Sequence, residues 1–185
     1  MDRALRRAML ERRREPAKIE RRSARSTMLA LRPITPEDEE FLARVYASSR
    51  AEELAVTGWS EELKADFCRR QFDAQSAYYS ANYPEASFQI IERDGWPVGR
   101  LYVARWEKEI RIVDITLLPE FRDSGIGTKL LRDLKTEARS AGKSLTIHVE
   151  RFNRALGLYD RLGFRQIEDK GVYLLMRWTS EEKRI

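Results

Sequence analysis

A turn with two closely spaced glycines constrains the fold of this 185-residue chain more than any other segment. An alternating apolar segment, residues 110–118, stops at Pro119, and the sequence Arg-Asp-Ser-Gly-Ile-Gly at residues 122–127 opens a stretch with helical apolar spacing. The first N–H groups of a helix lack partners within it, and about half a positive elementary charge collects there. Because glycine has no Cβ atom, a phosphate can approach such a backbone closely. The pattern predicts a strand, a turn and a helix whose N-terminus binds a pyrophosphate group.

Length and composition predict one soluble domain. A chain of 185 residues suits a single core with some surplus, and no apolar run approaches the ~20 residues of a membrane span. The one cysteine, Cys68, lies in a segment of helical character and is expected to be buried. A single cysteine excludes an intramolecular disulfide framework, and no apolar signal segment opens the chain. We therefore expect a cytoplasmic protein.

The basic charge of the chain is concentrated at its start. The whole chain carries a net charge of +5, whereas residues 1–27, with ten basic and four acidic side chains, carry +6. Residues 28–185 are therefore nearly neutral and present no face typical of nucleic-acid binding. Residues 1–27 also contain few large apolar side chains, which predicts a basic, disordered leader. A start wrongly assigned upstream of Met28 and an arm that binds nucleic acid without sequence specificity are the other interpretations.

Apolar periodicity and capping residues predict one α+β domain at residues 28–180, followed by a tail at 181–185. Thr35, with Pro36 and three acidic residues after it, is typical of a helix start, and Ser60 precedes a second helical segment. The fourth helix is short and begins near Arg154. The element order is β-α-α-β-β-β-α-β-α-β-β. The expected strands are residues 29–32, 88–91, 98–104, 110–118, 144–149, 164–167 and 172–178.

A second motif lies about 30 residues after the first. Residues 153–164 read Asn-Arg-Ala-Leu-Gly-Leu-Tyr-Asp-Arg-Leu-Gly-Phe. This segment, the Arg-x-x-Gly-x-Gly turn and the order of elements together resemble the GNAT acetyltransferase superfamily, in its bacterial-type, single-domain form, over residues 29–178. The resemblance implies a mixed, mostly antiparallel sheet of about seven strands, with helices on both faces and a split between the fourth and fifth strands.

Two other phosphate-binding motifs fit the glycine turn less well. A Rossmann site requires a third glycine where Leu130 stands and lies near the start of a parallel βαβ unit, whereas this turn follows an antiparallel meander. A Walker loop requires Gly-Lys followed by Ser or Thr, and Lys129-Leu130 does not provide it. Acetyl-CoA is therefore the expected anionic ligand, and no metal is expected.

The resemblance also implies which residues bind acetyl-CoA. Asp123 departs from the small residue usual in the family and places a negative charge beside the expected phosphates, while Ser124 could donate a hydrogen bond from its hydroxyl. The strand residues contribute through their main chain, between the splayed strands. The implied cofactor-binding residues are Arg122, Asp123, Ser124, Gly125, Ile126, Gly127 and Thr128 for the pyrophosphate, Ile115, Thr116 and Leu117 for the pantetheine, and Asn153.

The implied reaction is direct attack of an amine on the thioester, without an acyl-enzyme. Tyr159 matches the family's tyrosine that protonates the departing thiolate, and a phenol with a pKa near 10 carries its proton at neutral pH. The general base stays open, and a chain of water molecules with no dedicated base is one alternative. Many relatives place a glutamate on the fourth strand. By strict alternation of side chains along this strand, Arg111 and Val113 lie on the face where that glutamate stands, and Asp114 lies on the opposite face. His148 lies five residues before Asn153, where the branch that acetylates ribosomal-protein N-termini carries its base.

We therefore expect an acetyl-CoA-dependent N-acetyltransferase. An α-amine, with a pKa near 8, loses its proton more easily than lysine, which favours a small-molecule amine or a peptide N-terminus as acceptor. One alternative is a non-catalytic acyl-CoA-binding or sensor module, and another is a nucleic-acid partner acting through residues 1–27. The sequence leaves the oligomeric state open, a homodimer included. The segments expected at the acceptor contain Glu52, Glu53, Trp59, Tyr78, Tyr79 and Tyr83.

Overall fold

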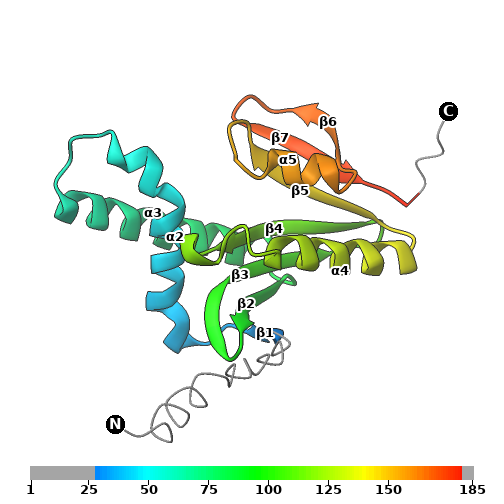
Figure 1. The fold of residues 1–185 in the computed structure, drawn as a ribbon, viewed down its shortest axis with the longest axis horizontal. Coiled ribbons are helices and arrows are strands. Elements are labelled where there is room, and N and C mark those ends of the chain that lie inside the picture. The colour runs from blue at the N-terminus through cyan, green and yellow to red at the C-terminus, as the bar shows by residue number, and fades with distance from the viewer. Residues whose placement is uncertain (1–27, 181–185) are drawn as a thin grey trace, which may run out of the picture.

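A seven-stranded sheet in the order β1-β2-β3-β4-β5-β7-β6 forms the centre of the molecule (Figure 1). The computed structural model describes residues 28–180, so the predictions for residues 1–27 and 181–185 lie outside the described residues. The strands are β1 (Leu29–Pro33), β2 (Ser87–Arg93), β3 (Trp96–Arg105), β4 (Glu109–Leu117), β5 (Ser144–Glu150), β6 (Arg165–Asp169) and β7 (Tyr173–Trp178). The helices are α2 (Glu39–Ala55), α3 (Glu61–Asn82), α4 (Ile126–Ser140) and α5 (Leu156–Arg161), with 3₁₀ turns η1 (Pro36–Asp38) and η2 (Pro119–Phe121).

The predicted architecture is confirmed. The elements follow one another in the predicted order, and every pair of neighbouring strands is antiparallel except β4 and β5. Parallel neighbours require a long crossover connection, which α4 supplies here. Among residues 28–180, no helix is both long enough and apolar enough to cross a membrane.

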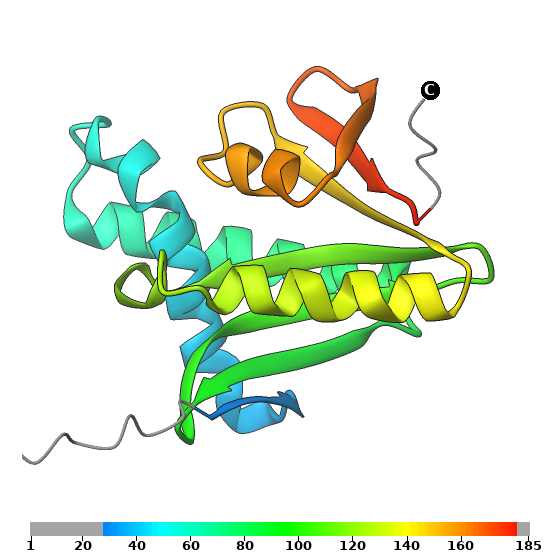
Figure 2. The same ribbon diagram turned by 45° about the vertical axis from the view of Figure 1, so that its right-hand side comes forward.

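Helices cover both faces of the sheet (Figure 2). α4 packs a stripe that includes Leu130, Leu134 and Ala138 against one face, as its i, i+4 apolar spacing requires. α5 lies on the same side, beside β5. α2 and α3 cover the other face, where Cys68 and Phe72 pack near Ile90. Cys68 is buried, as predicted.

The parallel pair β4 and β5 separates halfway along its length. Glu109–Ile112 pair with Ser144–Ile147, and no later residue of β4 pairs with β5 within the described chain. Figure 2 shows the two strands meeting near the C-terminal end of α4 and diverging toward α5. The split predicted between the fourth and fifth strands is therefore present.

A β-bulge in β4 lies at the point where the strands separate. Tyr102 pairs with Asp114 and Val103 pairs with Ile112, so Val113 has no partner on β3. An inserted residue reverses the alternation of the side chains that follow it. The sequence alternation had placed Asp114 on the face opposite Arg111; because of the bulge, the two side chains lie on the same face, the one covered by α3.

The end of the second motif anchors α5 to the core. Phe164 is fully buried, and its ring meets the edge of the Tyr159 ring with the centroids 5.5 Å apart. The φ of +85° at Gly163 lies in the left-handed region, which a glycine tolerates without strain. The Leu-Gly-Phe segment thus turns the chain sharply and fixes α5 beside the split.

Replacing Phe164 with alanine should lower the free energy of unfolding by about 3–5 kcal/mol, because the substitution leaves a cavity in a closely packed core. Urea denaturation followed by circular dichroism measures the change. Phe152, which is 95% exposed, provides the matched control. Phe152→Ala should change the free energy by no more than about 0.5 kcal/mol. Equal effects of the two substitutions would contradict the core position of Phe164.

Candidate functional site

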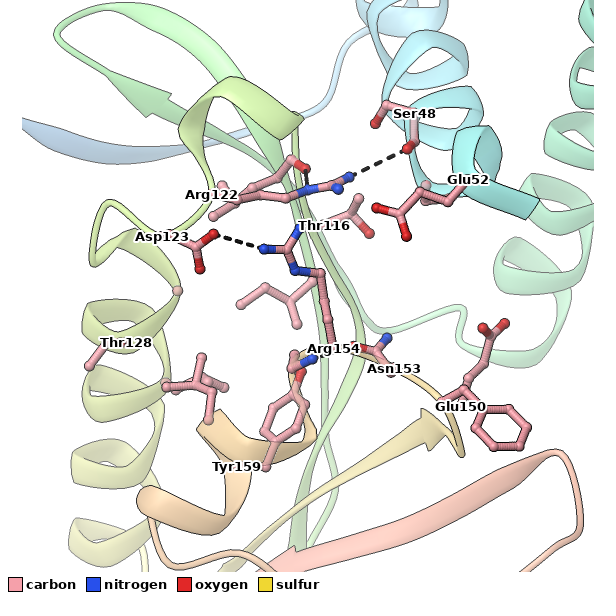
Figure 3. Close-up of a pocket in the computed structure, with 18 of the residues that line it drawn as sticks. Ser48, Glu52, Thr116, Arg122, Asp123, Thr128, Glu150, Asn153, Arg154 and Tyr159 are labelled. Carbon is pink, nitrogen blue, oxygen red and sulfur yellow. Dashed lines mark hydrogen bonds and ion pairs between the residues drawn. The ribbon is translucent and has the colours of Figure 1, made fainter. Parts of the chain in front are cut away.

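A cleft of about 710 Å³ opens where β4 and β5 separate (Figure 3). Its walls come from both sides of the sheet: α2 on one side, and α4 with α5 on the other. The lining residues are Ser48, Ser49, Glu52, Glu53, Ile115, Thr116, Leu117, Arg122, Asp123, Gly125, Gly127, Thr128, Leu131, Glu150, Phe152, Asn153, Arg154, Ala155, Leu158, Tyr159 and Arg161.

The N-terminus of α4 forms one end of this cleft. Gly125 is the N-cap, with a φ of +85°, and among the described residues no side chain caps the first N–H groups of the helix. A Cβ atom at Gly125 would meet nothing within 4 Å, and one at Gly127 would meet only a Leu158 methyl at 3.9 Å. The space beside these amides is therefore open, so the backbone there fits a phosphate group.

Side chains of the glycine turn fix its position. Arg122 donates hydrogen bonds to the carbonyl of Leu117 (3.0 Å) and to that of Ser48 on α2 (3.4 Å). The Ser124 hydroxyl donates to the carbonyl of Phe121 at 2.6 Å, so its proton is used within the turn. The Ile126 side chain is buried in the core. Ser124 and Ile126, both predicted to bind the pyrophosphate, are not among the lining residues of the cleft.

The last residues of β4 form an unpaired strand edge inside the cleft. Ile115, Thr116 and Leu117 line it, as predicted for the pantetheine-binding segment, and they have lost β5 as a hydrogen-bonding neighbour. A free edge presents N–H and C=O groups that a bound chain can pair with. Asn153 also lines the cleft, and its amide oxygen accepts a hydrogen bond from the N–H of Ala155.

Tyr159 enters the cleft from α5. Its side chain is largely buried against Phe164, and its hydroxyl is directed into the cleft (Figure 3). Burial, and next the negative charge of Asp114, raise the pKa of the Tyr159 phenol above its ordinary value of 10. The phenol is therefore protonated at neutral pH and can act as a hydrogen-bond donor.

Asp114 lies beside the split but outside the lining of the cleft. Its carboxylate accepts hydrogen bonds from Arg100 (2.8 Å), Thr116 (2.7 Å) and Tyr79 (3.3 Å). The side chains of Asp114 and Arg100 are 10% and 3% exposed, so this is a buried ion pair. Breaking such a pair leaves an uncompensated charge in the protein interior, which makes the pair costly to disrupt.

His148 is the first residue of β5 beyond the last pair with β4, and like Asp114 it is not among the lining residues of the cleft. Arg111 approaches its Nδ1 atom at 3.2 Å. Because arginine can only donate, Nδ1 must hold a lone pair, and the neutral imidazole carries its proton on Nε2. Burial, and then the charge of Arg111, lower the pKa of His148 below its ordinary value of 6.5.

The two ends of the cleft differ in charge. The N-terminus of α4 lies at one end with Arg154 and its partner Asp123, and the Arg122 guanidinium reaches from this turn to the Ser48 carbonyl of α2. The opposite end is acidic, and Figure 3 shows Glu52 and Glu150 across the cleft from Asp123 and Thr128. An anion is favoured at the first end and a cation at the second.

Arg50 joins two of the acidic side chains at the second end. It contacts the carboxylate of Glu53 at 2.7 Å and that of Glu150 at 3.5 Å. Glu52 has no ion-pair partner among the described residues. It is therefore the carboxylate at this end with a free charge.

Some of the residues that the sequence placed near the acceptor line the cleft, and others do not. Of the residues expected there, Glu52 and Glu53 line the cleft, whereas the aromatic ones do not. The i, i+4 spacing of Ser48 with Glu52, and of Ser49 with Glu53, is a polar stripe that could have identified one face of α2. The lining residues missed were Ser48, Ser49, Leu131, Glu150, Phe152, Arg154, Ala155, Leu158 and Arg161.

Comparisons with known proteins agree with this geometry. Residues 50–164 match the family model described as the acetyltransferase (GNAT) family. No curated protein sequence matches the chain significantly.

Several solved structures share the fold. A PaiA N-acetyltransferase from Thermoplasma acidophilum, in complex with coenzyme A, has a TM-score of 0.63 at 19% identity, over 82% of this chain and 99% of its own. The ribosomal-protein-S18-alanine N-acetyltransferase from Escherichia coli has 0.55 at 18%, over 85% and 99%. A GNAT family acetyltransferase from Brucella melitensis, in complex with acetyl-CoA, has 0.52 at 17%, over 85% and 92%.

The lowered pKa of His148 predicts a pH-dependent stability. Because the unfolded chain binds a proton near pH 6.5 and the folded chain only at lower pH, the contribution of the neutral imidazole is present above 6.5 and lost as the pH falls through the folded pKa. The free energy of unfolding should therefore fall more between about pH 7.5 and pH 5 in the unsubstituted chain than in His148→Gln. Since His148 is the only histidine, parallel pH profiles would contradict the shift.

Proposed function

Since the chain belongs to the GNAT acetyltransferase family, we propose that it transfers an acetyl group from acetyl-CoA to a primary amine by direct attack in a ternary complex. The family match bears out the resemblance carried by the two sequence motifs. One observation supports the finer proposal most strongly. A helix N-terminus open to an anion, an unpaired strand edge and a buried tyrosine hydroxyl all line the same cleft.

The cleft residues fit the donor. The pyrophosphate would lie against the N–H groups of the turn and of the first turn of α4, where Gly125 and Gly127 leave room for it. The pantetheine arm would pair with the free edge at Ile115–Leu117. Structural relatives crystallised with coenzyme A and with acetyl-CoA support this choice of donor.

Acetyl-CoA supplies an acetyl group activated as a thioester. In the proposed reaction the neutral amine nitrogen forms a bond to the thioester carbonyl carbon, and the carbon–sulfur bond breaks. An N–H at the β4 edge would donate to the carbonyl oxygen as it gains negative charge. The Tyr159 hydroxyl would give a proton to the leaving sulfur, and the attacking amine would release one to solvent or to a base.

The acidic end of the cleft suits the amine. The Glu52 carboxylate has no ion-pair partner among residues 28–180, so it can attract an ammonium group and accept its proton directly or through water. Asp114 and His148, the two candidate bases named from the sequence, each contact an arginine instead. For His148 to accept a proton at Nδ1, the bond from Arg111 would first have to break.

Tyr159→Phe should lower kcat about 10²-fold and leave the Kd for CoA within about twofold, because it removes only the proton donated to sulfur. Thiol release measures kcat with a panel of α-amines and lysine peptides, and calorimetry measures the Kd. Tyr78→Phe is the matched control, since Tyr78 is 56% exposed and outside the cleft.

Two outcomes would contradict parts of this proposal. An unchanged kcat in Tyr159→Phe would remove Tyr159 from the mechanism. If the unsubstituted chain binds CoA but releases no thiol with any amine, the chain is an acyl-CoA-binding module, the alternative that the engaged Asp114 and His148 favour.

A further inference from the structure

We propose that Arg154 is a diphosphate-binding residue. In the free protein it forms an ion pair with Asp123, and when the donor binds it exchanges Asp123 for the diphosphate. This inference rests on the proposed function, because it takes CoA as the ligand of the cleft. It also explains why an acid stands in a turn that should receive an anion. The two residues together set the affinity for the donor.

An ion pair spans the phosphate end of the cleft. Arg154 Nη2 donates to Asp123 Oδ2 at 2.8 Å, and both residues line the cleft (Figure 3). Asp123 belongs to the turn before α4, and Arg154 to the loop between β5 and α5. The pair therefore joins the two segments between which the diphosphate would lie.

Arg154 can exchange Asp123 for another acceptor at a low cost in free energy. The side chains of Arg154 and Asp123 are 59% and 82% exposed, and an exposed ion pair contributes little to stability. Arg154 gives Asp123 a single hydrogen bond, and the other donors of its guanidinium have no acceptor among residues 28–180. A guanidinium with free donors can bind a phosphate through two parallel hydrogen bonds, which are stronger than the one it makes here.

The other arginines of the cleft are placed differently. Arg122 is bonded to two backbone carbonyls, of Leu117 and Ser48, so it fixes the turn. Arg161 lies along α5, with its Nη1 atom 3.3 Å from the position that a Cβ of Gly157 would occupy. Arg154 is the cleft arginine held by a carboxylate, and its charge is available to a ligand that can replace that carboxylate.

Charge decides which ligands can make the replacement. A diphosphate is a stronger acceptor for Arg154 than a carboxylate, and it repels Asp123. A pantetheine without a nucleotide carries no phosphate at this position and leaves the pair intact. Asp123 thus weakens the binding of every phosphate ligand by the cost of separating the pair, and it does not affect ligands that lack phosphate.

Asp123→Asn should tighten CoA binding about two- to fivefold, the equivalent of one exposed ion pair, and leave pantetheine binding unchanged. Asparagine suits this position because it tolerates the left-handed region, in which Asp123 lies at a φ of +55°. Arg154→Gln should weaken CoA binding about tenfold at low salt, since it removes a charge-assisted hydrogen bond. Isothermal titration calorimetry measures all of these values.

The double-substitution cycle identifies the exchange itself. If Arg154 changes partner, Asp123→Asn gains less affinity in the Arg154→Gln background than in the unsubstituted chain, because no pair remains to be broken. Asp169→Asn is the matched control, since it breaks an exposed pair with Arg151 that lies outside the cleft. It should leave the Kd for CoA unchanged.

The failing outcomes are distinct. An unchanged or weaker affinity in Asp123→Asn, with normal CoA binding by the unsubstituted chain, overturns this inference alone. An equal gain in both backgrounds shows simple repulsion without exchange and also overturns it. If the unsubstituted chain does not bind CoA, the proposed function fails, and this inference fails with it.

Discussion

The loss of pairing between β4 and β5 is the constraint on which the site depends. Backbone N–H and C=O groups inside a sheet are almost always paired, and here the pairing stops at Ile112 and Ile147. The bulge at Val113 increases the local twist at the same point. A free strand edge therefore lies at the centre of the molecule, between helices that cover both faces. The cleft exists because these strands separate, and α4 and α5 form one of its walls.

The charges of the cleft follow from this geometry. The N-terminus of α4 and Arg154 lie at one end, while α2 and the last residue of β5 bring acids to the other. Asp123 is unexpected from the local sequence because its partner, Arg154, belongs to a different loop. Arg100 and Asp114 form a buried ion pair beside the split. The hydrogen bond from Tyr79 to Asp114 connects this pair to α3.

Local patterns predicted much of this protein correctly. Alternating strands, helical apolar stripes, capping residues and glycine turns indicated every strand and every α-helix of the described residues in order, because these features depend on residues close in sequence. Two motifs located the glycine turn, the end of β4 at Ile115–Leu117 and Tyr159, all of which contribute lining residues to the cleft. The bulge was missed because no glycine or proline marks it, and the face of Asp114 was wrong for that reason.

The sequence by itself determined the elements, their order and the chemistry available at the glycine turn and at Tyr159, since each is encoded within a few consecutive residues. Only the tertiary structure decided which charges are free. Asp114, His148 and Asp123 each meet an arginine from another segment, whereas Glu52 has no partner among the described residues. Whether a carboxylate or an imidazole is available depends on contacts made across the fold. These contacts cannot be predicted from the spacing of residues along one strand or helix.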